Sequence, residues 1–392
     1  MPSIFFPKST PIRALFAFQA TFSIIFCFVN VFLNVFLWDH GQTFRGIGVF
    51  NLFSVFSIFL FSLLGAYLLQ VFGTRATFMT SSILAFFLFF FLLTNTKSLP
   101  SLLPLLGMLY GGYVGLFYVG FNLMLIWLSH DSRRQYFIGL ESAVATTAQL
   151  LTPLASGLFI VSYGYQPIFL IILGIVLIQI LICLQIPQLK TNQRYQRRSF
   201  FLPENLQMAK LGFSSSAYGF YFAFIQMSYG LFIYFFIQDE FRLGSWNFIF
   251  GLISAIMYWI VGKHLNQSNQ DLMLGLGMIA SIIVTTTLML SEPFWFILFN
   301  LTISVSLPLL WIPTKTCHFT QIKRQAKTKS TAHLERMIQF LVFREFSISL
   351  GRLLFFVLTL SSFELGIGIS YYTMIILAVL MPFGIWFLNR HH

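Results

Sequence analysis

Three charged residues interrupt long apolar segments of the sequence, and they are the first candidates for chemistry. Glu141 lies in the apolar run over 136–162. Glu345 and Arg352 share the run over 338–361. A charge in the middle of a bilayer costs from about 2.5 kcal/mol upward, so such charges are usually paired or functional. Either glutamate could exchange a proton, and Arg352 could act as its counter-ion or bind an anionic group. The alternative is a charge network that only stabilises the fold.

The spacing of Glu345 and Arg352 limits how they can interact. Seven residues are two helical turns, so the two side chains share a helix face but lie about 10 Å apart along the axis. Direct pairing would therefore need extended side chains or a bridging water.

Uncharged polar residues in the apolar runs form a second set of candidates. Asn30 and Asn34 are one helical turn apart and face the same way. The other members of the set are Asn122, Gln149 and Gln226. Each could contact a solute, and each could equally form only hydrogen bonds between helices.

The sequence offers no pattern for a cofactor, a metal ion or an enzyme site. Cys27, Cys183 and Cys317 are far apart and lack metal-ligand spacing. We expect every histidine, His318 included, in a loop, at a loop edge or at the C-terminus, which disfavours a buried histidine relay. No glycine-rich phosphate loop occurs, so ATP is not the direct energy source. The acidic residues are also too scattered for a membrane-embedded transferase.

The composition indicates a chain dissolved in lipid. Of its 392 residues, 57% are hydrophobic and 9% are charged, and 51 are phenylalanine. A soluble domain could not cover so much apolar surface. The apolar runs repeatedly reach roughly 20 residues, the length a helix needs to cross a bilayer. They are continuous and not alternating, which excludes β-barrel strands. The sequence therefore predicts an all-α polytopic membrane protein.

We expect about twelve spans, and their loops predict the orientation. The spans are placed at 13–38, 47–71, 76–95, 101–128, 136–162, 166–186, 208–238, 246–263, 271–291, 294–313, 338–361 and 366–388. An even number puts both termini on one side. Most Lys and Arg residues then fall on that side, and only Arg45, Lys97 and Arg242 fall on the other. The positive-inside rule predicts that both termini are cytoplasmic. We expect the protein in the plasma membrane.

Two long basic loops are predicted on the cytoplasmic side, over 187–209 and 314–337, and the second contains Lys315. They contribute to a net charge of +12. This charge is explained by the positive-inside bias and by anionic lipid headgroups, so we expect no nucleic acid partner. The first loop divides the spans six and six. We therefore predict a linker at 187–209 between six-helix bundles over 1–186 and 210–392.

The two halves read as diverged copies of each other. The stretch over 31–39 reads VFLNVFLWD, and the stretch over 231–239 reads LFIYFFIQD. A short loop with a glycine follows each, at Gly46 and at Gly244, and then another apolar span. Two similar halves can rock about a site between them, which gives alternating access.

With this organisation the chain resembles the major facilitator superfamily over nearly its whole length. The loop between the second and third spans reads GAYLLQVFGTR, in which Gly65, Gly73 and Arg75 match the family pattern. The acidic residue of that pattern is missing. The fourth span contains GMLYGGYVG over 107–115, without the buried arginine that proton-driven exporters of the family usually have.

The fifth span carries a partial version of the family's exporter pattern. It reads LTPLASG over 151–157, with a threonine in place of the first glycine. Pro153 should bend this helix, and Gly157 should let a neighbour approach closely. An ordinary packing kink is the alternative. Together with Gly65, Gly73 and Arg75, these residues are our candidates for conformational change.

The resemblance implies a bacterial secondary transporter that moves a small solute by alternating access. In this family the fifth and eleventh spans border the central cavity, so Glu141, Glu345 and Arg352 are expected to face it. The predicted function is proton-coupled export of an amphipathic compound by a monomer. Its expected partners are the solute, a proton and membrane lipids. A non-transporting sensor or lipid-handling protein is the alternative.

Overall fold

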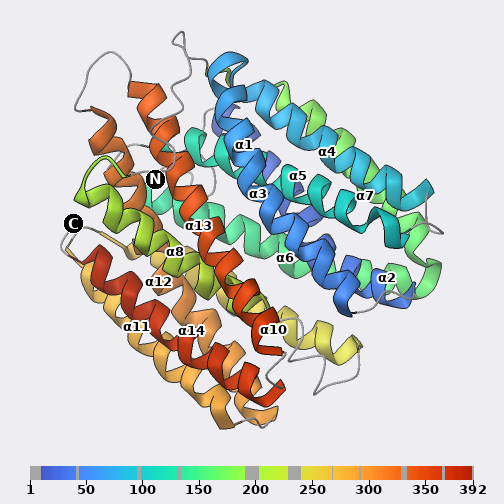
Figure 1. Ribbon diagram of the computed structural model, residues 1–392. Helices are drawn as coiled ribbons and strands as arrows, with labels where there is room; N and C mark the ends of the chain where they lie inside the picture. The colour runs from blue at the N-terminus through green and yellow to red at the C-terminus, as the bar shows by residue number, and fades with distance from the viewer. Residues whose placement is uncertain are drawn as a thin grey trace, which may run out of the picture. The chain divides into compact units, whose positions relative to one another are not determined.

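The computed structural model describes residues 10–40, 44–94, 99–129, 134–189, 203–227, 240–266, 268–290, 293–327, 333–363 and 367–390. Nearly all of these residues are helical, and none of them is in a strand (Figure 1). The predicted all-α fold is therefore confirmed.

Helices follow one another with short connections along the whole chain. The first part contains α1 (Thr10–Phe28), a π-helical turn (Val29–Leu33), α2 (Asn34–Asp39), α3 (Phe44–Val71), α4 (Thr74–Thr94), α5 (Leu99–Leu128), α6 (Arg134–Tyr163) and α7 (Tyr165–Cys183). The second part contains α8 (Leu206–Met227), α10 (Glu240–His264), α11 (Gln270–Thr287), a 3₁₀ turn (Leu288–Leu290), α12 (Pro293–Lys327), α13 (His333–Phe363) and α14 (Ile367–Asn389).

Nine helical segments within the described residues are long and apolar enough to cross a membrane. They are Pro11–Leu37, Gly46–Val71, Thr74–Thr94, Leu99–Leu128, Arg134–Tyr163, Tyr165–Cys183, Gln270–Leu290, Phe294–Ala326 and Tyr372–Asn389. A shorter apolar segment covers Phe248–His264 in α10. The predicted span over 208–238 is described only as far as Met227. The chain is therefore a multi-pass membrane protein.

One predicted boundary is wrong. The sequence places the end of a span at residue 313 and a basic loop over 314–337, but α12 continues without interruption to Lys327. Pro308 and Pro313 both lie inside this helix. The polar residues after Pro313 lower the local hydropathy, although the backbone remains helical. The first half of the predicted loop is therefore part of a helix.

The residue contacts divide the chain into two compact units. Unit 1 comprises Met1–Leu128, Leu151–Arg197 and Lys329–Val342. Unit 2 comprises Ser129–Leu150, Arg198–Thr328 and Phe343–His392. Two helices contribute to both units, because α6 changes unit after Leu150 and α13 changes unit after Val342.

Unit 1 is built around α5, which packs against α3 and α4, while α7 packs against α4 and α1. Glycines on one face of α5 let α3 approach. A Cβ at Gly107, Gly111 or Gly115 would come within 2.1–2.5 Å of a backbone oxygen of α3. These glycines repeat every four residues, so they form a stripe of small residues of the kind that brings membrane helices together.

Unit 2 holds a hydrophobic core around Phe220, Phe224, Phe299 and Phe355. Its packed helix pairs include α11 with α12, α8 with α14, and α10 with α12. The first half of α6 crosses α10 at two glycines, since a Cβ on Gly139 would lie 2.5 Å from the Cα of Gly262. This close crossing places the inner face of α6 within unit 2.

Candidate functional site

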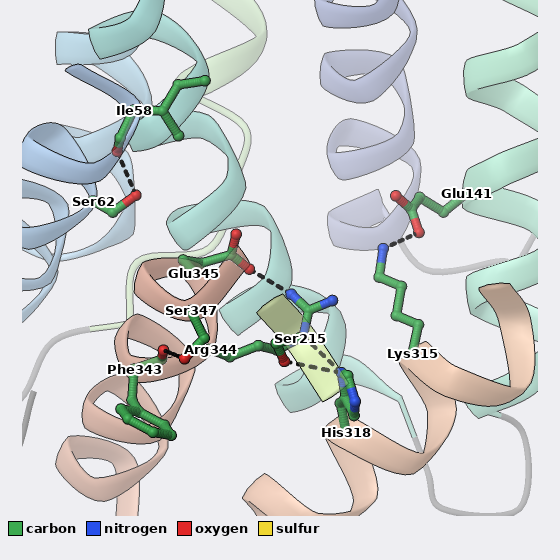
Figure 2. A network of polar contacts seen from close by, with 10 residues as sticks. All are labelled: Ile58, Ser62, Glu141, Ser215, Lys315, His318, Phe343, Arg344, Glu345 and Ser347. Atoms are coloured by element: carbon green, nitrogen blue, oxygen red, sulfur yellow. Dashed lines mark hydrogen bonds and ion pairs between the residues drawn. The ribbon is translucent and has the colours of Figure 1, made fainter. Parts of the chain in front are cut away.

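The main polar site of unit 2 begins with a lysine that the sequence places in a loop. Lys315 is 3% exposed and lies inside α12. Its Nζ is 2.5 Å from the Oε2 of Glu141, which is itself 6% exposed on α6 (Figure 2). The loop prediction for Lys315 is wrong because a carboxylate far away in the sequence compensates its charge within the protein.

Further hydrogen bonds join α12 to the start of α6 and to the residue that follows α5. The Nη1 of the buried Arg134 donates to Thr320 Oγ1 at 2.7 Å. The Nζ of Lys323 donates to the backbone oxygen of Ser129 at 3.2 Å. The Arg134 bond joins the start of α6 to α12 and so helps to hold Glu141 opposite Lys315, while the Lys323 bond joins α12 to the residue that follows α5.

A second ion pair lies on α13. The Nη1 of Arg344 is 2.5 Å from the Oε1 of Glu345, and both residues are buried. The Nε of Arg344 also donates to the Nδ1 of His318 at 3.3 Å (Figure 2). His318 is fully buried on α12. The expectation that every histidine lies in a loop or at a loop edge is therefore wrong for His318.

The hydrogen bonds of His318 define its tautomer. An arginine can only donate, so the Nδ1 that faces Arg344 must accept and carries no proton. The Nε2 then carries the ring proton and donates to Ser214 Oγ, at 3.1 Å. Asn389 Nδ2 donates to the same oxygen at 2.5 Å, and Ser215 Oγ lies 3.5 Å from Nδ1. His318 is therefore a neutral link between α8, α12 and α13.

Two aromatic rings join the ion pairs into one group. The Nζ of Lys315 lies 5.5 Å from the ring centre of Trp311 and 5.4 Å from that of Phe319. The Cζ of Arg344 lies 5.8 Å and 5.3 Å from the same two centres. We call Glu141, Lys315, His318, Arg344 and Glu345 the charged cluster. Its two cations balance its two carboxylates, which offsets part of the desolvation penalty of burying these charges.

Arg352 lies outside this cluster. It is partly exposed on α13, and its Cζ is 5.2 Å from the ring centre of Phe222 on α8. Its Nε is buried and has no hydrogen-bond partner among the described residues. The expected approach to Glu141 or Glu345 is not found in that part of the chain, because each carboxylate has another cation. A role for Arg352 stays a prediction.

The predicted asparagine pair of unit 1 belongs to a larger polar group. Asn30 Nδ2 donates to the hydroxyl of Tyr110 at 2.7 Å. Asn34 Nδ2 donates to the backbone oxygen of Asn30 at 3.3 Å, and Asn51 Nδ2 lies 3.5 Å from Asn34 Oδ1. The π-helical turn over Val29–Leu33 contains Asn30. Such turns recur at functional sites.

The remaining amide candidates lie apart from these groups. Asn122 is buried in α5, Gln149 is half-buried in α6 and Gln226 is exposed in α8. Their part in binding a solute is a prediction.

The connection between α3 and α4 contacts the segment that follows α7. Gly73 has φ +86°, and a Cβ there would lie 2.7 Å from the backbone oxygen of Leu189. Thr74 Oγ1 donates to the oxygen of Pro187 at 2.6 Å, and Arg75 Nε donates to that of Ile186 at 2.7 Å. The loop therefore binds the segment that leaves α7.

The other conformational candidates have ordinary helical environments. A Cβ on Gly65 would meet a side-chain carbon of Leu116 at 3.3 Å. Pro153 lies inside α6, and a Cβ on Gly157 would meet the ring of Phe32 at 3.8 Å. Gly157 therefore leaves room for a somewhat larger residue.

Metal ligands are not grouped in the described part of the chain, where no three His, Cys, Asp or Glu residues could share an ion. Cys27, Cys183 and Cys317 are all buried, and none of the three is in a disulfide.

Comparison with known proteins agrees with this architecture. The sequence model of the Major Facilitator Superfamily matches residues 12–334. The uncharacterised protein YqgE of Bacillus subtilis (strain 168) is 21% identical over 355 residues, which cover 87% of this chain and 80% of that protein. An uncharacterised protein of Geobacillus stearothermophilus, encoded in the sodM 3′ region, is 28% identical over 152 residues, which cover 38% of this chain and 71% of that protein.

Solved structures show the same fold. The human organic anion transporter MFSD10 (TETRAN) has a TM-score of 0.74 at 13% identity, covering 97% of this chain and 99% of that one. The E. coli fucose:proton symporter FucP has a TM-score of 0.68 at 12% identity, covering 96% and 97%. The helical fold and the match to the family over most of the sequence lead to one assignment. The chain belongs to the Major Facilitator Superfamily.

Proposed function

We propose that this protein is a proton-coupled secondary transporter that exports a small amphipathic compound by alternating access. It would work in the plasma membrane, with both termini in the cytoplasm. Membrane transport follows from the family. Proton coupling, direction and the kind of solute are the proposal.

The Glu141–Lys315 ion pair is the observation that carries proton coupling. Both residues are buried, their atoms are 2.5 Å apart, and they belong to different helices. Protonation of Glu141 would remove its charge and leave Lys315 with a buried charge and no ion-pair partner. Breaking a buried pair costs about 3–5 kcal/mol. That cost favours an arrangement in which α6 and α12 separate, so proton binding and helix movement would be linked.

The export direction and the amphipathic solute are supported by sequence. The exporter-like stretch over 151–157 includes Pro153, inside α6 and close to the residue where this helix changes unit. Half-buried aromatic side chains of unit 2, Phe222 and Trp311 among them, could contact the apolar part of such a solute. The fold of a fucose:proton symporter is compatible with proton coupling.

The test uses Glu141→Gln in the purified protein, reconstituted in liposomes. A thermal-shift screen first finds a compound that stabilises the protein, because a ligand that binds the folded state raises its apparent stability. Counterflow of that compound and its accumulation driven by a proton gradient are then measured separately. We expect Glu141→Gln to retain counterflow and to lose gradient-driven accumulation by about tenfold or more.

Glu204→Gln is the matched control, since Glu204 is an exposed glutamate of the same unit. It should accumulate the compound as the unmodified protein does. If the unmodified protein binds compounds but shows neither counterflow nor accumulation, transport is refuted in favour of a sensor. If Glu141→Gln accumulates normally, Glu141 is not the coupling group.

A further inference from the structure

A row of aromatic rings in unit 2 connects Arg352 to the charged cluster. The guanidinium carbon of Arg352 lies 5.2 Å from the ring centre of Phe222. The ring of Phe222 stacks on that of Tyr218 at 5.7 Å, and Tyr218 stacks on Trp311 at 3.9 Å. Trp311 in turn lies under Lys315 and Arg344 of the charged cluster. We call Phe222, Tyr218 and Trp311 the aromatic strip.

Close helix packing holds Arg352 at the end of this strip. A Cβ on Gly351 would lie 1.9 Å from the backbone oxygen of Ser216 on α8, and one on Gly219 would lie 2.1 Å from that of Ile348 on α13. Ser216 Oγ also donates to the backbone oxygen of Ser347 at 2.8 Å. With these contacts in place, α13 cannot rotate freely, and Arg352 stays over Phe222.

Arg352 differs from the other cations of this region because none of the described residues balances its charge. Lys315 and Arg344 each have a carboxylate at 2.5 Å. No carboxylate partner of Arg352 is found in the described parts of unit 2, where only the Phe222 ring contacts its charge. An aromatic face offsets only part of the cost of such a charge. Among the described residues, the site therefore lacks an anion.

The neighbouring side chains indicate what kind of anion would fit. Phe222 and Trp311 are half-buried, so part of each ring is accessible, while Tyr218 between them is buried. Gln226 follows Phe222 by one helical turn, so this exposed amide lies on the same face of α8. One end of the site thus offers a cation and an amide, and the remainder offers rings.

We propose that unit 2 binds an organic monoanion, with its carboxylate on Arg352 and its apolar body along the aromatic strip. This inference rests on the proposed transport function and names its substrate class. The guanidinium fork suits a carboxylate, which it can bind through two parallel hydrogen bonds. The charged cluster is already neutral, so it does not compete for the anion.

The test compares three probes that share one apolar body: phenylbutyrate, phenylbutanol and phenylbutylamine. Their binding to the purified full-length protein is measured at neutral pH by equilibrium dialysis, without any gradient. We expect phenylbutyrate to bind about tenfold more tightly than phenylbutanol, and phenylbutylamine to bind most weakly. Arg352→Gln should reduce phenylbutyrate binding to the level of the alcohol and leave the alcohol unaffected.

Arg390→Gln provides the matched control. Arg390 is also partly exposed, and its Cζ lies over aromatic rings, 4.7 Å from the ring centre of Trp386 and 4.9 Å from that of Phe387. Its replacement should not change the order of the three probes. Phe222→Leu should weaken all three, because it removes part of the strip and leaves the charge. Arg352→Lys keeps the charge without the fork and should retain only part of the preference for phenylbutyrate.

Two results would overturn the proposal. One is that the alcohol or the amine binds as tightly as the carboxylate. The other is that folded Arg352→Gln or Arg352→Lys binds phenylbutyrate as the unmodified protein does. Binding is measured without transport, so anion binding through Arg352 in a protein that moves no solute would refute the transport function alone. If the protein transports a compound and Arg352→Gln leaves that transport unchanged, this inference alone would be refuted.

Discussion

At the scale of single residues, the charged cluster illustrates how a membrane protein retains charges in its interior. An isolated buried charge is too costly to keep, and a paired one is tolerated at little net gain. Lys315 and Glu141 satisfy each other, and the rings of Trp311 and Phe319 cover the cations. The intact pair therefore adds little to the free energy of unfolding, although removing one member should lower that free energy strongly.

This asymmetry predicts a double-mutant cycle. Lys315→Met and Glu141→Gln should each lower the unfolding temperature of the purified protein, since each leaves one uncompensated buried charge, at about 3–5 kcal/mol. The double variant Glu141→Gln/Lys315→Met should be more stable than either single variant. Lys210→Met removes an exposed lysine of the same unit and should change little. If the single effects simply add up in the double variant, the pair is not a coupled unit.

At the scale of elements, short connections have demanding geometry. The α3–α4 connection turns at Gly73, with φ +86°, and the side chains of Thr74 and Arg75 that follow donate to backbone oxygens of the segment after α7. The α6–α7 connection turns at Gly164, with φ +78°, but no atom approaches within 4 Å of a Cβ there. The two glycines thus share a positive φ and differ in their surroundings.

That difference predicts unequal effects of two alanine substitutions. Gly164→Ala is strained only by its backbone, because φ +78° with ψ −175° is a conformation that is essentially restricted to glycine, at about 1–3 kcal/mol. Gly73→Ala is strained by its positive φ and also forces the Leu189 oxygen away, because the new Cβ would lie 2.7 Å from it. We expect Gly73→Ala to lower the unfolding temperature clearly more than Gly164→Ala. Equal effects would mean that the Leu189 contact yields without cost and that the loop does not hold this segment.

At the scale of the whole molecule, apolar runs were sufficient to predict an all-α membrane protein, which the fold confirms. The family was predicted from the resemblance in the number and division of the spans and in the motif residues, and the family match confirms it. Local sequence could not reveal the partner of Glu141, although Arg344, the partner of Glu345, is its neighbour in the sequence. Lys315 is 174 positions from Glu141, and its polar neighbours on α12 resemble a loop. His318 was misplaced for the same reason, since hydropathy measures composition and not burial.

The orientation of the whole chain in the membrane is the last prediction. Reversing it would place most of the Lys and Arg residues outside, against the positive-inside rule. Cys27, Cys183 and Cys317 are all buried, so the unmodified protein should react weakly with an impermeant maleimide. Ser268 is exposed after α10 and Tyr163 is exposed at the end of α6, at positions that we predict to be on opposite sides.

The measurement labels Ser268→Cys and Tyr163→Cys separately. On intact cells we expect Tyr163→Cys to react and Ser268→Cys to stay unlabelled, because the second thiol would face the cytoplasm. In inside-out vesicles the order should be reversed. Permeabilised cells provide the control, since both thiols must react there if both are exposed. Labelling of Ser268→Cys alone on intact cells would place both termini outside. The predicted orientation would then be wrong, and the proposed direction of export would have no support from it.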